Sequence, residues 1–265
     1  MKNPVAVIGS IVLGAGTTAV QILSLFIQTV YWTITGPFKR KFAKSESIFD
    51  QMVFTGVKSI VIVFFVAFFT GIVIAMQSAY QLSRLGATVY VAALVAVSVA
   101  RELGPVLTAL VIAGRIGAAI TAEIGTMVVT EQVEALNTLA LNPIRFLVVP
   151  RFLALLVMLP CLTVFSDIAG IFGGYLVGVF NLHINPSLYW STTYRFLEAK
   201  DVLTGVYKSV VFGIIISMVG CYQGLNTKGG AEGVGKYTTV SVVASFILVI
   251  VADCIMTAIF YFSKM

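Results

Sequence analysis

Five ionisable residues lie inside long apolar stretches of this sequence, and they are the first candidates for chemistry. They are Arg101, Glu102, Asp167, Lys208 and Asp253. A charge within a membrane is costly, so an ionisable residue at such a position usually marks a functional site. Opposite charges at similar depth can pair. The set could therefore line a polar cavity, or it could merely lock helices together through Arg101–Glu102 and Lys208–Asp253 pairs.

The composition indicates what kind of protein must position these charges. The chain has 265 residues, of which 59% are apolar and 11% charged, and its net charge is +6. A soluble domain would carry roughly a quarter charged residues, and a disordered chain would carry more charge and fewer aromatic residues. Both classes are excluded. The positive charges lie between apolar blocks, which favours a membrane protein over a nucleic-acid-binding one.

Five apolar stretches are long enough to cross a membrane as helices. The hydrocarbon core is about 30 Å thick and a helix rises about 1.5 Å per residue, so a span needs about 20 apolar residues. In the third stretch, glycine recurs every four residues at Gly170, Gly174 and Gly178, which predicts close helix contact. We expect an all-α polytopic membrane protein with spans at residues 59–83, 85–114, 150–181, 202–225 and 237–263.

The amino-terminal block, residues 4–38, is also uncharged, but its polar residues are not scattered. At 100° per residue they fall on one stripe of a helix. Such a stripe fits a helix that lies in the membrane interface, or a spanning helix that turns the stripe toward the bundle. The pattern leaves both alternatives open. The stripe consists of Thr17, Gln21, Ser24, Gln28 and Thr35.

Orientation follows from the Lys and Arg residues near the span ends, because cytoplasmic loops are enriched in them. Ten such residues fall on one side and four on the other, which predicts a cytoplasmic amino terminus and a carboxyl terminus outside the cytoplasm. The amino-terminal block is too long for a cleavable signal peptide and no charged run precedes it. The ten are Lys39, Arg40, Lys41, Lys44, Lys58, Arg115, Arg145, Arg151, Lys228 and Lys236, and the four are Arg84, Arg195, Lys200 and Lys264.

A short amphipathic helix is predicted between the second and third spans, within residues 122–145 on the cytoplasmic side. Thr130 can cap it, and Asn142-Pro143 would end it, because the residue before a proline avoids the helical region. The helix could rest on the membrane surface as a connector or dock into a groove of a soluble partner. Its polar residues are Glu131, Gln132, Glu134 and Asn137, and its apolar ones are Val133, Leu136, Leu139 and Ala140.

Four ordered blocks resemble the MlaE (YrbE-type) permease family of ATP-binding-cassette (ABC) transporters. The resemblance runs from about residue 45 to the end of the chain. The blocks are ARELGPVLTALVIAGRIGAAITAEIGTM at 100–127, TEQVEALNTLALNP at 130–143, PRFLALLVMLPCLT at 150–163 and NTKGGAEGVGKYTTVSVV at 226–243.

The resemblance implies a homodimeric inner-membrane permease of a Gram-negative envelope. Residues 1–45 would hold an interfacial helix and a basic segment, and residues 46–265 the five-span domain with a coupling helix at about 130–141. Its partners would be a cytoplasmic ABC ATPase, a STAS-domain protein and a periplasmic hexamer of MCE-domain subunits. The chain would bind no cofactor itself, because ATP and Mg²⁺ belong to the ATPase. The expected task is phospholipid movement between the two membranes, which maintains outer-membrane lipid asymmetry.

On this interpretation, Arg101 or Lys208 would meet the phosphate of a lipid headgroup, while Glu102, Asp253 and Asp167 balance the charge. Near the outer end of the first span, Gln77 and Leu82 could border a lipid entry. Contact with the ATPase is expected at the coupling helix, through Glu131, Gln132, Glu134, Leu136 and Asn137.

Residues 230–236 match the GxxxxGK pattern of phosphate-binding loops, but Tyr237 replaces the Ser or Thr that binds magnesium. We interpret these glycines as a flexible turn close to the ATPase. Two other classes remain as alternatives. A stand-alone proton-coupled transporter of a lipid or other hydrophobic substrate would use Glu102, Asp167 or Asp253. An intramembrane lipid-modifying enzyme is disfavoured, because the chain has one histidine and no GxSxG or HExxH motif.

Overall fold

The computed structural model describes residues 4–38 and 45–262, and this part of the chain consists of helices joined by short turns, without strands. Five helical segments are long and apolar enough to cross a membrane, which confirms the predicted number. They are Glu46–Ser83, Thr88–Val129, Ile144–Asn181, Ala199–Leu225 and Gly230–Phe262. Four of the basic residues used for orientation, Lys39, Arg40, Lys41 and Lys44, lie outside the described residues, as does Lys264.

The first two spans are built from several helices each. The first joins α2 (Ser45–Thr55), η1 (Val57–Ser59) and α3 (Ile60–Ser83). The second joins η2 (Thr88–Tyr90), α4 (Val91–Ser98), the π-turn η3 (Val99–Leu103), α5 (Gly104–Ile112), the π-turn η4 (Ala113–Gly117) and α6 (Ala118–Val129). The second span therefore continues well beyond the predicted end at residue 114.

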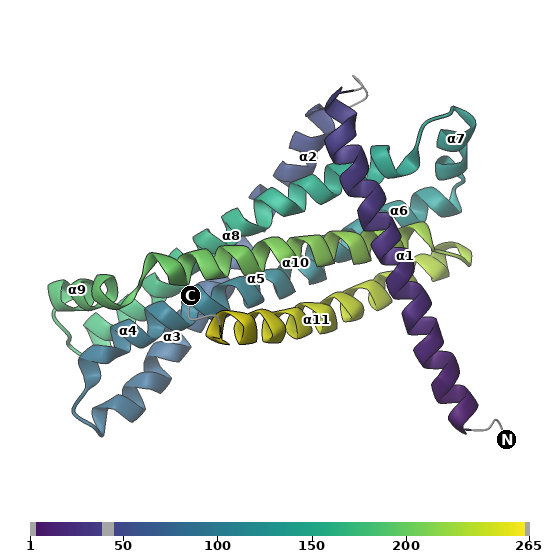
Figure 1. The fold of residues 1–265 in the computed structure, drawn as a ribbon. Helices are drawn as coiled ribbons and strands as arrows, with labels where there is room; N and C mark the ends of the chain where they lie inside the picture. Colours follow the sequence, from purple (N-terminus) through teal and green to yellow (C-terminus); the bar gives the residue numbers. More distant parts are fainter. Residues whose placement is uncertain (1–3, 39–44, 263–265) are drawn as a thin grey trace.

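Two short helices lie in the connections before and after the third span. The third span contains η5 (Ile144–Val148), α8 (Val149–Leu176) and η6 (Val177–Asn181), and the last two are α10 (Ala199–Leu225) and α11 (Gly230–Phe262). The short helices are α7 (Gln132–Thr138) and α9 (Pro186–Phe196), which lie at opposite ends of the bundle (Figure 1). Below, these ends are called the α7 end and the α9 end.

The central helix of the bundle is α8, which packs against α3, α10, α2 and α5. In its apolar window 61% of the residues are buried, compared with 11% in α11. Glycines make the close approach possible. A Cβ at Gly170 would lie 2.9 Å from Val99 Cγ1, and one at Gly174 would lie 2.6 Å from Val95 Cγ1. The predicted glycine face is thus a packing surface.

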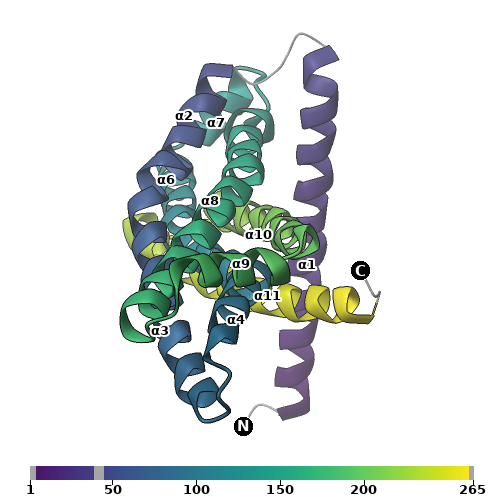
Figure 2. The ribbon, with the colours of Figure 1, turned by 90° about the vertical axis from the view of Figure 1, so that its left-hand side faces the viewer.

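Helix α1 (Pro4–Phe38) crosses the bundle steeply instead of running alongside the other helices (Figures 1 and 2). It touches η5, α10 and α8, and the Gln21 side chain of the polar stripe accepts a hydrogen bond from the Tyr222 hydroxyl. This crossing is the arrangement expected of a helix that follows the membrane surface. Its position relative to a bilayer stays a prediction.

The connection between α10 and α11 corrects one interpretation. Residues 230–236, predicted as a flexible turn, form the first two turns of α11, and the connection is only Asn226–Gly229. The chain reverses at Gly229 and Gly230, which have positive φ. Only a small part of the glycine-rich run is therefore needed for the turn, and the rest is free to continue the helix.

Candidate functional site

The second span places Arg101 and Glu102 at a local break in its helix. They lie in the π-turn η3, where the Gly104 amide donates to the Val99 carbonyl, five residues earlier. Pro105 follows directly and has no N–H to donate to the Arg101 carbonyl. A π-turn at this point shifts the helix register. The two neighbouring side chains reach different partners on α10.

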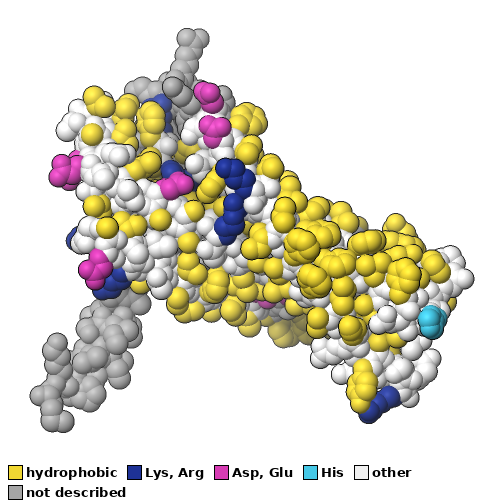
Figure 3. Space-filling view, turned by 180° about the vertical axis from the view of Figure 1, so that it is seen from behind, with side chains coloured by type: hydrophobic (Ala, Val, Ile, Leu, Met, Phe, Trp, Pro, Cys, Tyr) yellow, Lys and Arg dark blue, Asp and Glu magenta, His cyan; other side chains and the backbone are white. Residues whose placement is uncertain are grey.

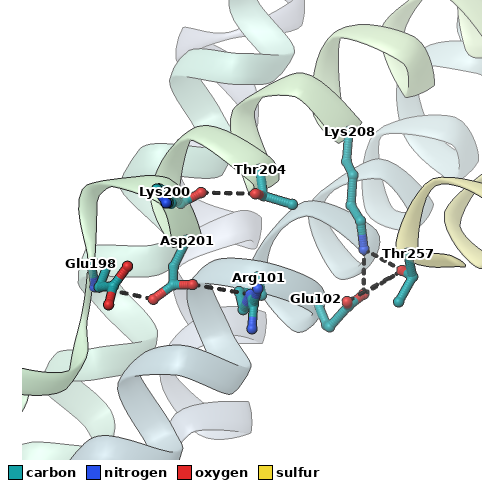
Figure 4. Close-up of polar contacts among 8 residues, drawn as sticks. All are labelled: Arg101, Glu102, Glu198, Lys200, Asp201, Thr204, Lys208 and Thr257. Carbon is teal, nitrogen blue, oxygen red and sulfur yellow. Dashed lines mark hydrogen bonds and ion pairs between the residues drawn. The ribbon is translucent and has the colours of Figure 1, made fainter. Parts of the chain in front are cut away.

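The Glu102 side chain belongs to an ionic cluster centred on Lys208 (Figure 4). Lys208 is fully buried, and its ammonium donates to Glu102 Oε2 and to Thr257 Oγ1 at 2.6 Å. The same ammonium lies 2.8 Å from Asp253 Oδ1, in an ion pair without the alignment of a hydrogen bond. An ammonium has three donors, and three oxygens surround this one. The Lys208–Asp253 pair indicated by the sequence is present, and oxygens of the chain itself surround the Lys208 ammonium.

Arg101 is arranged differently. Its Nε lies 3.0 Å from Asp201 Oδ1, while 44% of its side chain remains exposed. Asp201 is held in turn by the capping box at the start of α10, where its Oδ2 accepts from the Glu198 amide at 3.0 Å. The predicted Arg101–Glu102 pair is replaced by this contact. Among the described residues Asp201 is the ion-pair partner of Arg101 at one edge of its guanidinium, and a guanidinium can bind a second anion through its other edge.

A cavity of about 300 Å³ opens beside Arg101 and the exposed side of Glu102. This volume is at the lower end of the range for small-molecule sites. Hydroxyl groups and three charged groups line one part, and aliphatic and aromatic side chains line the rest. The lining residues are Val97, Ser98, Arg101, Glu102, Thr204, Lys208, Thr257, Phe260 and Tyr261.

Three other predicted site residues lie away from this cavity. Asp167 is buried on α8 against Gly104, and neither of its carboxylate oxygens has a hydrogen-bond partner among the residues that the structure describes. Gln77 is exposed on α3, and Leu82 packs into a small apolar cluster with α4 and η6. These positions separate Asp167, Gln77 and Leu82 from the ionic cluster.

The site also contains residues that the sequence analysis did not identify, chiefly Asp201 and Thr257. Both could have been found from helix periodicity. Asp201 is seven residues before Lys208, and Thr257 is four residues after Asp253, so each pair shares a helix face. The predicted span at 202–225 began one residue too late to include Asp201.

The predicted coupling segment forms α7 at the α7 end of the bundle, and its side chains are exposed or half-buried. The predicted cap at Thr130 is wrong, because its hydroxyl donates to the Thr126 carbonyl, and Glu131 with φ 61° occupies the cap position. The helix ends before Pro143. Ala140 adopts φ 56°, and the Leu141 amide donates to the Leu136 carbonyl, as in a Schellman motif.

The residues predicted to contact the ATPase occupy this helix or its cap. Glu131, Gln132, Glu134 and Asn137 are exposed, and Leu136 is half-buried. Their side chains are therefore available at the surface of the α7 end.

Comparison with known proteins gives a consistent result. The model of the family described as Permease MlaE matches residues 48–259. A probable ABC transporter permease protein of Rickettsia prowazekii is 46% identical over 214 residues, which cover 81% of this chain and 83% of the relative. The intermembrane phospholipid transport system permease protein MlaE of Haemophilus influenzae is 37% identical over 212 residues, 80% of this chain and 81% of the relative. A probable ABC transporter permease protein of Synechocystis is 44% identical over 204 residues, 77% and 78% of the two chains.

Proposed function

The chain belongs to the MlaE permease family, and from this premise we propose that it moves phospholipids between the inner and outer membranes as the permease subunit of an ABC transporter. The transport would maintain outer-membrane lipid asymmetry. The observation that carries the proposal is the cavity beside Arg101, which offers an exposed guanidinium next to apolar walls. A phospholipid has the matching chemistry, a phosphate attached to hydrocarbon chains.

In this proposal, Arg101 and Lys208 have different roles. Arg101 binds the lipid phosphate through the guanidinium edge that Asp201 leaves open, since guanidinium pairs well with phosphate. Lys208 holds α4–α5, α10 and α11 together through Glu102 and Asp253, and it does not contact the lipid. Of the two alternatives raised by the sequence, we thus assign the cavity role to Arg101 and the helix-locking role to Lys208.

The energy for transport would come from a separate ABC ATPase that binds ATP and Mg²⁺. We propose that the ATPase docks on α7 at the α7 end, and that its closure rocks the helices and pushes lipid from the cavity toward the α9 end. A STAS-domain protein would accompany the ATPase, and a hexamer of MCE-domain subunits would receive the lipid on the periplasmic side. The amino terminus would be cytoplasmic and the carboxyl terminus periplasmic.

We also propose that the working unit is a homodimer. The outward face of α11 supports this, because large apolar side chains such as Ile247, Ile250 and Ile259 are exposed on it. In a bilayer, lipid or a second helix can cover such a face. The dimer would bring two cavities into one complex.

A first experiment tests the class of transporter. The tagged chain is purified from native membranes under mild conditions and assayed for an associated ATPase and for bound phospholipid. We expect the ATPase and phospholipid to co-purify with the chain, in amounts that stay constant relative to the chain between preparations. A chain that transports lipid alone, driven by a proton gradient and without an ATPase, would contradict the proposal and favour the secondary-transporter alternative.

A second experiment tests the coupling role of α7. Reversing the charges with Glu131→Lys and Glu134→Lys should release the ATPase or uncouple ATP hydrolysis from transport, while the chain still assembles. Asp50→Lys on α2 is the matched control, because Asp50 is also exposed and lies outside α7. Normal coupling in the α7 double variant would show that α7 is not the coupling element.

A further inference from the structure

A pair of basic residues shares one aromatic ring near the start of the first span. Lys58 Nζ lies 5.5 Å from the centre of the Phe54 ring, and Arg115 Cζ lies 5.7 Å from the same centre. Both distances are within the range of cation–π contacts. Arg115 also donates through Nη1 to the Ser59 hydroxyl, which itself donates to the Thr55 carbonyl at 2.6 Å. The guanidinium is therefore held at a defined position next to the exposed ammonium of Lys58.

This basic pair, Lys58 and Arg115, has no acidic partner in the described parts of the chain. The ion pairs there involve Arg101, Arg151 and Lys208, and none reaches Lys58 or Arg115. Lys58 is exposed and Arg115 is half-buried. Cation–π contacts soften the mutual repulsion of two positive charges but do not neutralise them. An external anion would complete the site.

The depth of the pair identifies the kind of anion. Along their helices, Lys58 lies about 38 Å from Ser83 and Arg115 about 40 Å from Thr88, at about 1.5 Å per residue. A bilayer has a hydrocarbon core of about 30 Å and a total thickness of about 40–45 Å. With Ser83 and Thr88 at the outer boundary of the core and the spans tilted by about 20°, the pair lies about 6–8 Å beyond the other boundary, at the outer edge of the headgroup layer. Figure 3 shows Lys and Arg side chains at the border between the apolar band and the more polar α7 end.

We propose that Lys58 and Arg115 form a binding site for the phosphate of an anionic phospholipid in the leaflet at the α7 end. The Arg115 guanidinium, fixed by Ser59, contacts the phosphate, and the flexible Lys58 ammonium closes over it. The acyl chains lie along the exposed apolar side chains Ile62 and Phe65 of α3. Basic pockets between transmembrane helices at the cytoplasmic headgroup level are suited to such lipids.

This site is distinct from the cavity beside Arg101. The π-turns that carry Arg101 and Arg115 are about 21 Å apart along the second span, at about 1.5 Å per residue, and none of Lys58, Ser59 and Arg115 lines the cavity. The bound lipid would be a resident lipid that anchors the permease. The inference does not rest on the proposed transport function, and lipid binding to the isolated chain tests it.

The test uses the full chain, purified in detergent micelles and titrated with dioctanoyl phosphatidylglycerol while the midpoint of thermal unfolding is recorded. We expect saturable stabilisation that weakens at high salt. Lys58→Gln should weaken binding roughly five-fold, since one basic residue near an anionic lipid contributes about 1 kcal/mol. Lys58→Arg should bind as the unchanged chain does, because the positive charge is kept.

Three further arms make the result decisive. Lys236→Gln removes another exposed lysine and should leave binding unchanged. Dioctanoyl phosphatidylcholine and inorganic phosphate, at the same concentrations, should each stabilise the chain much less. Equal stabilisation by phosphatidylcholine would mean that the site does not select an anionic headgroup, and equal stabilisation by inorganic phosphate would mean a free-anion site. Either result, or unchanged affinity in Lys58→Gln, would overturn the proposal.

Discussion

Two regions of this membrane protein hold a lysine next to an arginine-bearing π-turn. The lysine is buried and paired in one region, and exposed without an acidic partner among the described residues in the other. In the ionic cluster, Lys208 is fully buried and three side-chain oxygens surround its ammonium. In the basic pair, Lys58 is exposed and its contact in the described structure is the Phe54 ring. Both regions connect the second span to another helix. They differ in whether the protein itself neutralises the charge.

The difference is explained by depth in the bilayer. A charge inside the hydrocarbon finds no water, so the protein must supply every partner, as it does around Lys208. A charge at the headgroup level finds water and lipid phosphates, and the protein can leave it open. Arg101 combines both cases, because one edge of its guanidinium is paired and much of the side chain is exposed at the cavity. Buried pairing thus indicates a structural role, and partial pairing next to a cavity indicates a binding role.

The largest predicted effect separates the two lysines. Lys208→Ala would leave Glu102 and Asp253 close together without their cation, and breaking a buried ion pair costs about 3–5 kcal/mol. Lys58→Ala should change the free energy of unfolding by less than about 0.5 kcal/mol, as is usual for a surface substitution. Unfolding in detergent micelles measures both values.

A compensated variant sharpens this comparison. Lys208→Met combined with Glu102→Gln and Asp253→Asn removes all three charges, and it should recover most of the stability lost in Lys208→Ala. Equal stability of Lys208→Ala and Lys58→Ala would show that the buried cluster is not a lock.

The next effect concerns the π-turn that presents Arg101. A methyl group at Gly104 would overlap the Asp167 carboxylate, so Gly104→Ala should destabilise the fold by about 1–3 kcal/mol. Adding Asp167→Ala should restore much of the loss. The matched control is Gly235→Ala, where a methyl group meets nothing within 4 Å and the helix should gain up to about 1 kcal/mol. No difference between the two glycines would refute the packing of α8 against this turn.

A smaller effect on stability is expected at Arg101. The side chain is partly exposed, and Arg101→Ala should cost at most about 1 kcal/mol, in the range of partly exposed ion pairs. The same variant should reduce ATP-driven phospholipid transfer by the reconstituted complex at least about ten-fold, a loss of about 1.4 kcal/mol in effective binding. A stability loss as large as that of Lys208→Ala would instead show that Arg101, like Lys208, mainly holds the helices together.

The smallest effect lies at the end of α7. Ala140 has φ 56°, a conformation that costs an L-residue about 1–2 kcal/mol and that glycine adopts freely. Ala140→Gly should therefore raise the free energy of unfolding slightly, by up to about 1 kcal/mol, and leave coupling intact. Slower hydrogen exchange in α7 would report the gain. A loss of stability would contradict the observed Schellman geometry.

The sequence predicted the features that depend on hydropathy and helix periodicity. The five spans are correct in number because each is a long apolar run, and the Lys208–Asp253 pair is correct because isolated opposite charges in such runs have few other partners. The glycine spacing in α8 also indicated close packing before the partner helices were known. These signals are local, and no knowledge of the tertiary structure is needed to read them.

The sequence could not predict features that depend on tertiary geometry. The π-turn at Val99–Leu103 shifts the register of the second span, so Arg101 reaches Asp201 while Glu102 reaches Lys208. Asp167 has the same sequence signal as Asp253, yet it lies against Gly104, and no cation of the described part of the chain pairs with it. Helix α11 begins at Gly230, earlier than predicted, because a glycine-rich run permits a turn but does not require one.

In the proposed mechanism, Arg101 holds a phospholipid phosphate in the cavity, while Lys208 only supports the walls. The most direct test places the photo-crosslinking residue benzoylphenylalanine at position 260 in place of Phe260, which lines the cavity, within the complete transporter in its native membrane. After irradiation, mass spectrometry of the chain should find a phospholipid adduct, about ten-fold less abundant with Arg101→Ala and intermediate in abundance with Arg101→Lys, which keeps the charge but not the second guanidinium edge. Equal adduct yields with arginine and alanine at position 101 would contradict the claim.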